Sequence, residues 1–360
     1  MCAVVLIVLT ACDKEQNIKA DQAAHFGNGV EYDQREQLLL QFIETKLSSE
    51  DGMIYTNYVD SEQNEQVATG HEVLSESMGL AMRYYARAGL QEAFQNTLTA
   101  LNDHFNLDSG YSYRYSPKHD EAYTVNAAVD DLRVIRALYE AVEQFGNDQY
   151  KQYAEQLATR FFSHNVSDER LHDFYDDSYD VHNNFITLCY VDLRTLKLMD
   201  YNNEHSKLIQ AMTEHIHNGY ISDEFPFYET RYMYDEGVYQ SEDINTIESL
   251  LTILSLVEVD QHKAASIDFI KERVERGELF GRYSHDGKPL TDVQSTAIYA
   301  ITAMIGSELG DQPLYEASIN RMEQYQILQN DHELYGAYGN SDSLQVFSFD
   351  NLQALLAYTY

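Results

Sequence analysis

Apolar residues recur along this chain in two patterns, and both of them indicate helices. The stretch TAIYAITAMIG at 296–306 is apolar nearly all the way round, whereas QYKQYAEQLATRFF at 149–162 carries its apolar residues on one side. The first pattern is typical of a helix buried on all faces, and the second is typical of a helix with one face in water. The chain therefore predicts two layers of helices.

Six short segments rich in Tyr, Gly and Asp separate these helical patterns. They begin at residues 51, 109, 171, 227, 279 and 334. Two helical patterns lie between successive segments, which predicts twelve helices in total. The clearest span residues 34–46, 74–88, 91–105, 127–145, 149–162, 244–257, 262–276 and 347–358. Repetition at a steady period is the mark of a repeat architecture.

The alternation of the two helix types predicts how the repeats assemble. Helices that follow a Tyr-rich segment are apolar throughout, and those that precede one are amphipathic. Inner helices buried on every face and outer helices wet on one face suit a closed ring of helical hairpins. We expect an all-α (α/α)6 toroid over residues 32–360, with an open α-solenoid as the alternative; six units favour closure. The six segments then gather at one end of the ring, beside the N-termini of the inner helices.

The N-terminus predicts export. Residues 3–11 form an apolar run that is too short to span a bilayer and has the length of a signal-peptide core. The sequence Leu9-Thr10-Ala11-Cys12 resembles a bacterial lipobox, which implies cleavage before Cys12 and lipidation of its thiol. We expect a signal peptide at 1–11, a flexible lipidated tether at 12–31, and a location on the outer face of the cytoplasmic membrane of a Gram-positive bacterium. A disordered apolar start is the alternative.

Charge and composition narrow the choice of partners. The chain has 24 Lys and Arg against 59 Asp and Glu, a formal net charge of -35. Nucleic acid is excluded because phosphate contacts need a basic surface. Neutral or cationic polymers fit better, although acidity alone also keeps an exported protein soluble. We expect a monomer without cofactor or metal, since no Cys/His cluster has metal-site spacing and His215 and His217 point to different faces of a helix.

The predicted ring brings carboxylates and tyrosines to one end. Glu76 opens a buried helix, and Asp131, Asp235 and Asp243 lie at or near the starts of others. Cleavage of a glycosidic bond needs one carboxylic acid to protonate the leaving oxygen and one carboxylate to activate water or attack carbon. Tyrosine rings can stack on the apolar faces of sugars. This end of the ring therefore predicts a glycosidase site.

Three stretches resemble glycoside hydrolase family 8. LSESMGLAMRYYARAG is similar to the family's SEG.GYGM..A signature, which implies that Glu76 is the general acid. AAVDDLRVIRALYEA resembles ATDADLDIAYALLLA, with Asp131 on the aspartate that positions the substrate and Arg133 in place of a later aspartate. YMYDEGVYQ resembles YDA.R, which implies that Asp235 is the general base, with Asp243 as the alternative.

The resemblance also implies a reaction and a substrate class. Family 8 enzymes are inverting, mostly endo-acting (α/α)6 hydrolases of β-glucans, chitosan and related polymers, and lipoprotein relatives associated with exopolysaccharide and biofilm formation look most similar. The chain contains no Trp, which argues against cellulose and favours a β-linked bacterial exopolysaccharide, including amino-sugar polymers. Most tyrosines are expected to pack between helices. The residues expected to contact substrate are Tyr113, Tyr115, Asn183, Tyr232, Tyr234, Tyr283 and Tyr338.

Two alternatives remain at this stage. One is an (α/α)6 hydrolase or lyase of another family that acts on uronates, which the scarcity of Lys and Arg in the Tyr-rich segments disfavours. The other is a surface lipoprotein that retains polysaccharide without cutting it. Replacing Glu76 by Gln would abolish turnover in a hydrolase and leave a binding protein unchanged.

Overall fold

The computed structural model describes residues 26–28, 33–64, 67–199 and 205–360. The predicted signal peptide and most of the predicted tether lie outside the described residues, as does Cys12. Within the described ranges, no helix is both long enough and apolar enough to cross a membrane.

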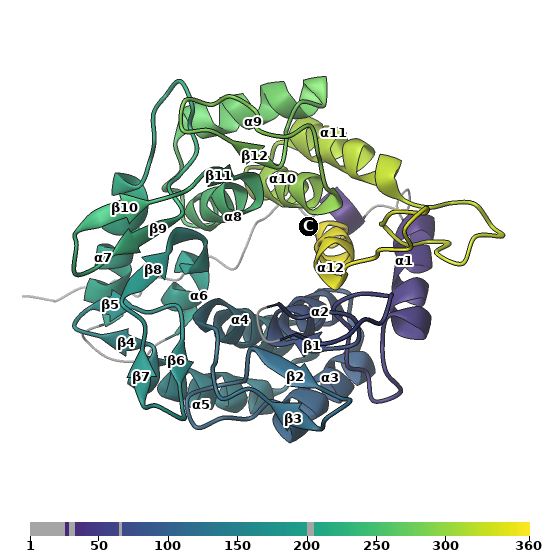
Figure 1. Cartoon of the computed structure of the whole chain (residues 1–360), viewed down its shortest axis with the longest axis horizontal. Coiled ribbons are helices and arrows are strands. Elements are labelled where there is room, and N and C mark those ends of the chain that lie inside the picture. Colours follow the sequence, from purple (N-terminus) through teal and green to yellow (C-terminus); the bar gives the residue numbers. More distant parts are fainter. Residues whose placement is uncertain (1–25, 29–32, 65–66, 200–204) are drawn as a thin grey trace, which may run out of the picture.

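The described residues contain twelve α-helices in two concentric layers, which confirms the predicted architecture (Figure 1). The inner helices are α2 (Ser75–Arg87), α4 (Ala128–Phe145), α6 (Leu193–Leu198), α8 (Thr246–Val257), α10 (Thr296–Glu308) and α12 (Ser348–Ala357). The outer helices are α1 (Asp33–Lys46), α3 (Gln91–His104), α5 (Asp148–His164), α7 (His205–Asn218), α9 (Ala264–Arg276) and α11 (Gln312–Met322). Three short 3-10 helices accompany them: η1 (Phe26–Asn28), η2 (Leu188–Tyr190) and η3 (Glu323–Tyr325).

The ring is closed, so the alternative of an open solenoid does not hold. The last inner helix, α12, packs beside the first, α2 (Figure 1). Ser77 Oγ and Ser348 Oγ lie 2.8 Å apart across this junction, and both side chains are buried. Because α2 and α12 each bury every face, neither would be stable at the exposed end of an open array.

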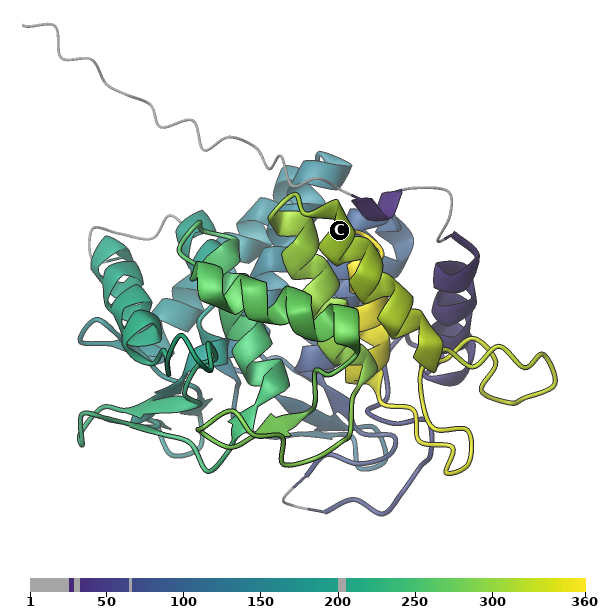
Figure 2. The same cartoon turned by 90° about the horizontal axis from the view of Figure 1, so that it is seen from above.

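The Tyr-rich segments form short antiparallel strands at the end of the ring where the inner helices begin (Figure 2). Two three-stranded sheets have the orders β1-β2-β3 and β10-β9-β8, and three hairpins pair β4 with β5, β6 with β7 and β11 with β12. The strands are β1 (Val73–Leu74), β2 (Arg114–Ser116), β3 (Glu121–Ala122), β4 (Val166–Ser167), β5 (Arg170–Leu171), β6 (Tyr175–Asp176), β7 (Val181–His182), β8 (Phe185–Thr187), β9 (Arg231–Met233), β10 (Val238–Gln240), β11 (Ile244–Asn245) and β12 (Arg282–Tyr283).

The opposite end of the ring is held by buried ion pairs. Glu140 on α4 accepts from Arg83 at 2.8 Å and lies 3.5 Å from both Arg87 and Arg136. Arg136 also pairs with Glu258 at 2.7 Å, immediately after α8. These groups join α2, α4 and the residue after α8, and Arg87 lies in the last turn of α2, where a cation also interacts favourably with the helix dipole. The strand-bearing end, by contrast, carries Glu76 in the first turn of α2.

Candidate active site

Glu76 lies in the first turn of α2, at the strand-bearing end of the ring. Its side chain keeps 28% of its surface exposed although dense protein surrounds it. Arg133 on α4 donates from Nη1 to Glu76 Oε2 at 3.4 Å. The same guanidinium forms an ion pair with Asp130. An acid, a cation and a second carboxylate therefore meet at a partly open position.

The surroundings of Glu76 favour its protonated form. Burial is the main cause that raises its pKa, to about 7, and the charge of Asp130 adds to it. The positive charge of Arg133 opposes both. A carboxyl group with a pKa of about 7 is protonated in about half of the molecules at neutral pH, whereas an ordinary glutamate is almost fully ionised there; a general acid needs this protonated fraction.

Asp130, rather than Asp131, is the carboxylate beside Glu76. Ser75 Oγ donates to Asp130 Oδ2 at 3.0 Å, so this aspartate bridges the N-termini of α2 and α4. Burial raises the pKa of Asp130, and its contacts with Arg133 and Ser75 oppose that rise. Asp130 was not among the residues predicted for the site, although it is one of two adjacent aspartates at the start of a buried helix. Successive helical residues point about 100° apart, so the two carboxylates face different neighbours.

Asp131 binds the backbone of the preceding Tyr-rich segment. It is fully buried, and its carboxylate accepts from Tyr111 N and Asn126 Nδ2, each at 3.0 Å. A Cβ atom on Gly110 would lie 2.0 Å from Asp131 Oδ2, so the backbone passes directly over the carboxylate. Burial raises the pKa of Asp131 to about 8. Its predicted role in positioning substrate stays a prediction, and the structure shows that it does not contact Glu76.

The bond made by Asp131 recurs in two other repeats. Ser249 Oγ accepts from Tyr228 N at 3.3 Å, and Asn351 Oδ1 accepts from Tyr338 N at 2.9 Å. Asp131, Ser249 and Asn351 are each the fourth residue of their inner helix. A polar side chain at this position therefore anchors the segment before the helix, and a neutral group serves as well as a carboxylate.

Further carboxylates lie at the start of α8 and in the third Tyr-rich segment. Asp173 accepts from Thr187 N at 2.7 Å and from Thr187 Oγ1 at 2.6 Å. Burial raises the pKa of Asp173 to about 6, with Glu248 contributing through its charge. Burial likewise raises the pKa of Glu248, and the charge of neighbouring Asp243 adds to it. Sequence reasoning missed Asp173 and Glu248, because neither lies in a motif of the family.

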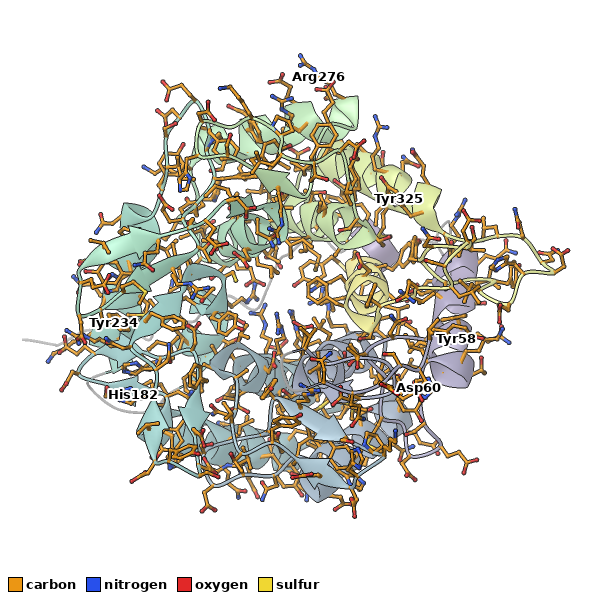
Figure 3. All side chains as sticks on the ribbon, in the orientation of Figure 1. Tyr58, Asp60, His182, Tyr234, Arg276 and Tyr325 are labelled. Carbon is orange, nitrogen blue, oxygen red and sulfur yellow. The ribbon has the colours of Figure 1, made fainter. Side chains whose placement is uncertain are left out.

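The two candidates for the general base occupy different settings. Asp243 precedes α8 and, together with Glu248, lines a hollow of about 660 Å³. It forms an ion pair with Arg282 at 2.9 Å, and 25% of its side chain is exposed. Asp235 lies in the exposed turn between β9 and β10 and accepts from Asn184 at 2.5 Å. Its neighbour Tyr234 lies on the outer side of the ring of inner helices (Figure 3). Asp243 is therefore the candidate attached to an inner helix.

Most of the predicted substrate contacts are packing residues. Tyr115, Tyr234, Tyr283 and Tyr338 are at most 7% exposed. Their hydroxyls donate to Asp120, to Leu171 O and to Glu278 O, and in the case of Tyr338 pair with the Tyr358 hydroxyl. The Asn183 amide bonds Phe174 N and Phe185 O. The expectation that these five side chains face substrate needs correction, since their polar atoms are already bonded inside the protein.

Tyr113 and Tyr232 remain half-buried. Tyr113 lies close to the start of α2, because its backbone carbonyl accepts from the N–H of Ser75, the residue before Glu76, at 3.1 Å. The Tyr232 ring packs against His215 and Tyr239 instead. Of the predicted tyrosines, Tyr113 is thus the one that the structure brings to the N-terminus of α2. In the described part of the chain, no group of three or more His, Cys, Asp or Glu is arranged to hold a metal ion.

Known proteins resemble the chain over most of its length. No family model matches it. A Bacillus subtilis (strain 168) protein named as a lipoprotein, YdaJ, is 27% identical over 325 residues, which cover 88% of this chain and 84% of that protein. The structure of an α-amylase from Clostridium perfringens is 33% identical and has a TM-score of 0.84, covering 90% of this chain and 97% of that one.

Solved structures with lower identity share the fold. PssZ from Listeria monocytogenes is 19% identical with a TM-score of 0.69, covering 89% of this chain and 94% of that one. A family 8 xylanase mutant from Teredinibacter turnerae, in complex with xylohexaose, is 12% identical with a TM-score of 0.65. The match covers 92% of this chain and 93% of that one. The α-amylase, at 33% identity over nearly its whole length, supports an enzyme of this fold. The chain therefore shares the (α/α)6 fold of these enzymes, family 8 glycosidases among them, and its similarity to the α-amylase shows that it is a glycoside hydrolase.

Proposed function

We propose that this enzyme cleaves a polysaccharide with inversion at the strand-bearing end of the ring, and that Glu76 is its general acid. The observation that carries the proposal is the position of Glu76 in the first turn of a buried inner helix, partly open and next to Arg133, which also pairs with Asp130. Burial also raises its pKa to about 7, which supports this role. Glu76 then donates its proton to the glycosidic oxygen as the bond to the leaving sugar breaks.

The general base activates a water on the opposite face of the sugar ring. In inverting enzymes the two carboxyl groups lie roughly 6.5–9.5 Å apart, which leaves room for that water. We assign this role first to Asp243, because it precedes an inner helix and lines a hollow. Asp235, the other candidate, lies in an exposed turn.

Two polymer classes are candidate substrates. Family resemblance and the acidic charge of the chain favour a β-linked bacterial exopolysaccharide, including amino-sugar polymers. The second candidate is an α-linked glucan, which the similarity to the α-amylase at 33% identity favours. Attack by water inverts the anomeric configuration in either case, so the same two carboxyl groups could serve both linkages.

Attachment to the membrane through a lipid on Cys12 is part of the proposal. The lipobox-like Leu9-Thr10-Ala11-Cys12 and the related protein named as a lipoprotein both support it. A single lipidated cysteine would hold the ring outside the cell within reach of surface polymers.

Release of reducing ends by residues 26–360 tests the proposed activity. The panel holds soluble starch, mixed-linkage β-glucan, acetylated and deacetylated amino-sugar polymers and the producing bacterium's own exopolysaccharide. Glu76→Gln keeps the size of the side chain and removes its proton donor, so we expect turnover to fall by about 10²–10⁴-fold while binding persists. Release from one polymer class names the substrate. Binding without release in both proteins would contradict a hydrolase and leave a protein that retains polysaccharide.

A further inference from the structure

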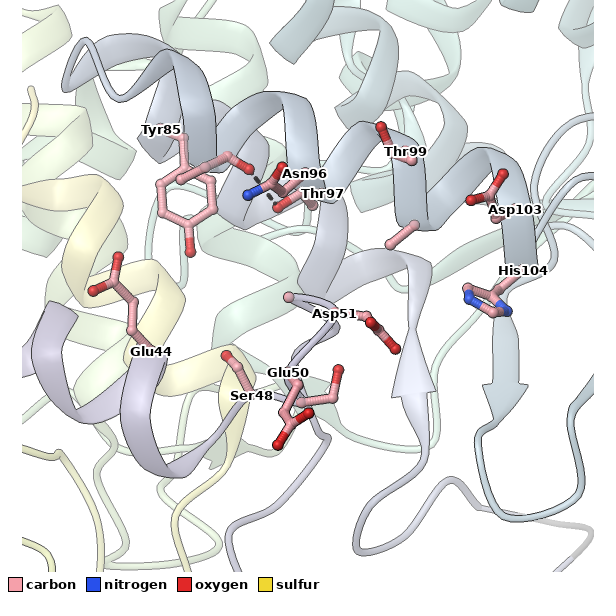
Figure 4. Close-up of a pocket in the computed structure, with 14 residues that line it drawn as sticks. Glu44, Ser48, Glu50, Asp51, Tyr85, Asn96, Thr97, Thr99, Asp103 and His104 are labelled. Atoms are coloured by element: carbon pink, nitrogen blue, oxygen red, sulfur yellow. Dashed lines mark hydrogen bonds between the residues drawn. The ribbon is translucent and has the colours of Figure 1, made fainter.

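A groove on the outer wall of the ring lies apart from the proposed active site. It is bounded by α1, by residues 48–52, by α3 and by Tyr85 of α2, and its volume is about 600 Å³ (Figure 4). Tyr85 follows Glu76 by nine residues on α2, which corresponds to roughly 14 Å along the helix axis. We call this hollow the outer groove. Its size is within the range of pockets that bind small ligands.

Four exposed carboxylates line the outer groove, together with the imidazole of His104. They are Glu44 from α1, Glu50 and Asp51 from the following segment, and Asp103 from α3. No ion pair involves any of the four within the described ranges, and no Lys or Arg is among the residues that line the groove. Four carboxylates around one hollow make its electrostatic potential negative, so a ligand with positive charge would be attracted, most strongly at low salt.

An unbonded hydroxyl independently indicates a ligand. Tyr85 is 6% exposed, and its ring lies against that of Tyr84. Its hydroxyl points into the outer groove and has no hydrogen-bond partner among the described residues (Figure 4). Buried tyrosine hydroxyls usually find a partner. A ligand in the groove would supply one.

The remaining lining groups indicate what kind of cation fits. The Asn96 amide can donate to and accept from a sugar hydroxyl, whereas Ser48 and Thr99 already donate to Ile43 O and Gln95 O and can only accept. The four carboxylates are not arranged as a metal site in the described part of the chain. We propose that the outer groove is a second carbohydrate site that binds saccharides bearing free amino groups, with ammonium groups on the carboxylates and one ligand hydroxyl or amine on Tyr85.

Binding to the full ring tests this proposal independently of which polymer is cleaved. The protein carries Glu76→Gln so that no ligand is consumed, and titration calorimetry at low salt and about pH 6 keeps the carboxylates ionised. The probes are the hexamer of glucosamine, the hexamer of N-acetylglucosamine, and spermine. We expect the glucosamine hexamer to bind at least tenfold more tightly than either of the other two.

Variants locate the binding. Asp51→Asn with Asp103→Asn should weaken the glucosamine hexamer about tenfold, and Tyr85→Phe about threefold to tenfold, the size of one hydrogen bond. Glu92→Gln is the matched control, because Glu92 is an exposed carboxylate of the same helix as Asp103 that does not line the groove. It should change affinity less than twofold. Equal binding of both hexamers, equally tight binding of spermine, or unchanged affinity in the groove variants would each overturn the proposal.

Discussion

The guanidinium of Arg133 lies 3.4 Å from the carboxylate of Glu76, so the proposed general acid touches a cation. A cation in contact with a carboxyl group lowers its pKa, so less of the group stays protonated at neutral pH to act as a general acid. Asp130 pairs with the same guanidinium and offsets this effect, and burial then dominates. The pKa of Glu76 therefore depends on burial and on the charges of Arg133 and Asp130, which lie on the neighbouring helix.

Removing the positive charge of Arg133 should keep Glu76 protonated, and the enzyme active, to a higher pH. Arg133→Met abolishes the charge that lowers the pKa of Glu76. The pKa then rises, Glu76 keeps its proton to a higher pH, and the alkaline limb of the kcat/KM profile should move upward. Arg133→Lys is the control, since it keeps a positive charge. An unmoved alkaline limb in Arg133→Met would contradict the assignment of that limb to Glu76.

Neutralising Asp130 should shift the pKa of Glu76 in the opposite direction, downward. Asp130→Asn removes a charge that raises the pKa of Glu76 and leaves Arg133 free to act on it. Glu76 then loses its proton at a lower pH, so the alkaline limb of kcat/KM should move downward. Asn can still accept from Ser75 Oγ, which limits damage to the fold. A shift upward would show that Asp130 does not act on Glu76 through its charge.

Asp131 offers a test that separates anchoring from catalysis. Asn351 makes the same kind of bond with an amide, so Asp131→Asn should keep the bond from Tyr111 N and lose only the one from Asn126 Nδ2. Asp131→Ala leaves Tyr111 N without its partner and should lower the free energy of unfolding by about 1–3 kcal/mol. Thermal unfolding and kcat/KM are measured on both. Full activity in a stable Asp131→Asn protein would limit Asp131 to anchoring, and a loss of activity there would support the predicted role in positioning substrate.

The general base can be identified by two isosteric changes. Asp243→Asn should lower kcat by about 10²–10⁴-fold, because the attacking water loses the group that takes its proton. Asp235→Asn should retain activity close to that of the unchanged enzyme, since its side chain lies in an exposed turn. Steady-state kinetics on the polymer that releases reducing ends distinguish the two. The reverse result would assign the base to Asp235.

The buried ion pairs of Glu140, at the end of the ring opposite the strands, should contribute to the free energy of unfolding. Burial alone would raise the pKa of Glu140, but Arg83, Arg87 and Arg136 together lower it. Glu140→Gln leaves three guanidiniums short of a partner and should cost about 3–5 kcal/mol of unfolding free energy. Because the folded pKa is lowered, this stabilisation is present above the unfolded pKa of about 4.3 and is lost as the pH falls below it.

Denaturant unfolding at neutral pH measures this loss. Glu143→Gln is the matched control, because Glu143 lies on the same helix with its side chain exposed. It should change the unfolding free energy by less than about 0.5 kcal/mol. Equal stability of the two variants would mean that the buried ion pairs contribute no more than surface charges do.

The sequence by itself determined the helices, their number and their two layers. Apolar periodicity is a local property of the chain, so fully apolar stretches such as 296–306 could be assigned to the inner layer without knowing their neighbours. The same reasoning identified Glu76, because a carboxylate at the start of a buried helix departs from the pattern around it.

Only the tertiary structure decided which polar groups meet. Asp130 and Asp131 are indistinguishable by pattern. The packing of α4 against α2 brings Asp130 to Ser75 and Arg133, while Asp131 faces the Tyr111 backbone. Tyrosines such as Tyr283 and Tyr338 could have faced a ligand or the core, and packing placed them in the core. The physical reason is that helix periodicity depends on neighbours along the chain, whereas the partner of a side chain depends on residues that the fold brings from far away.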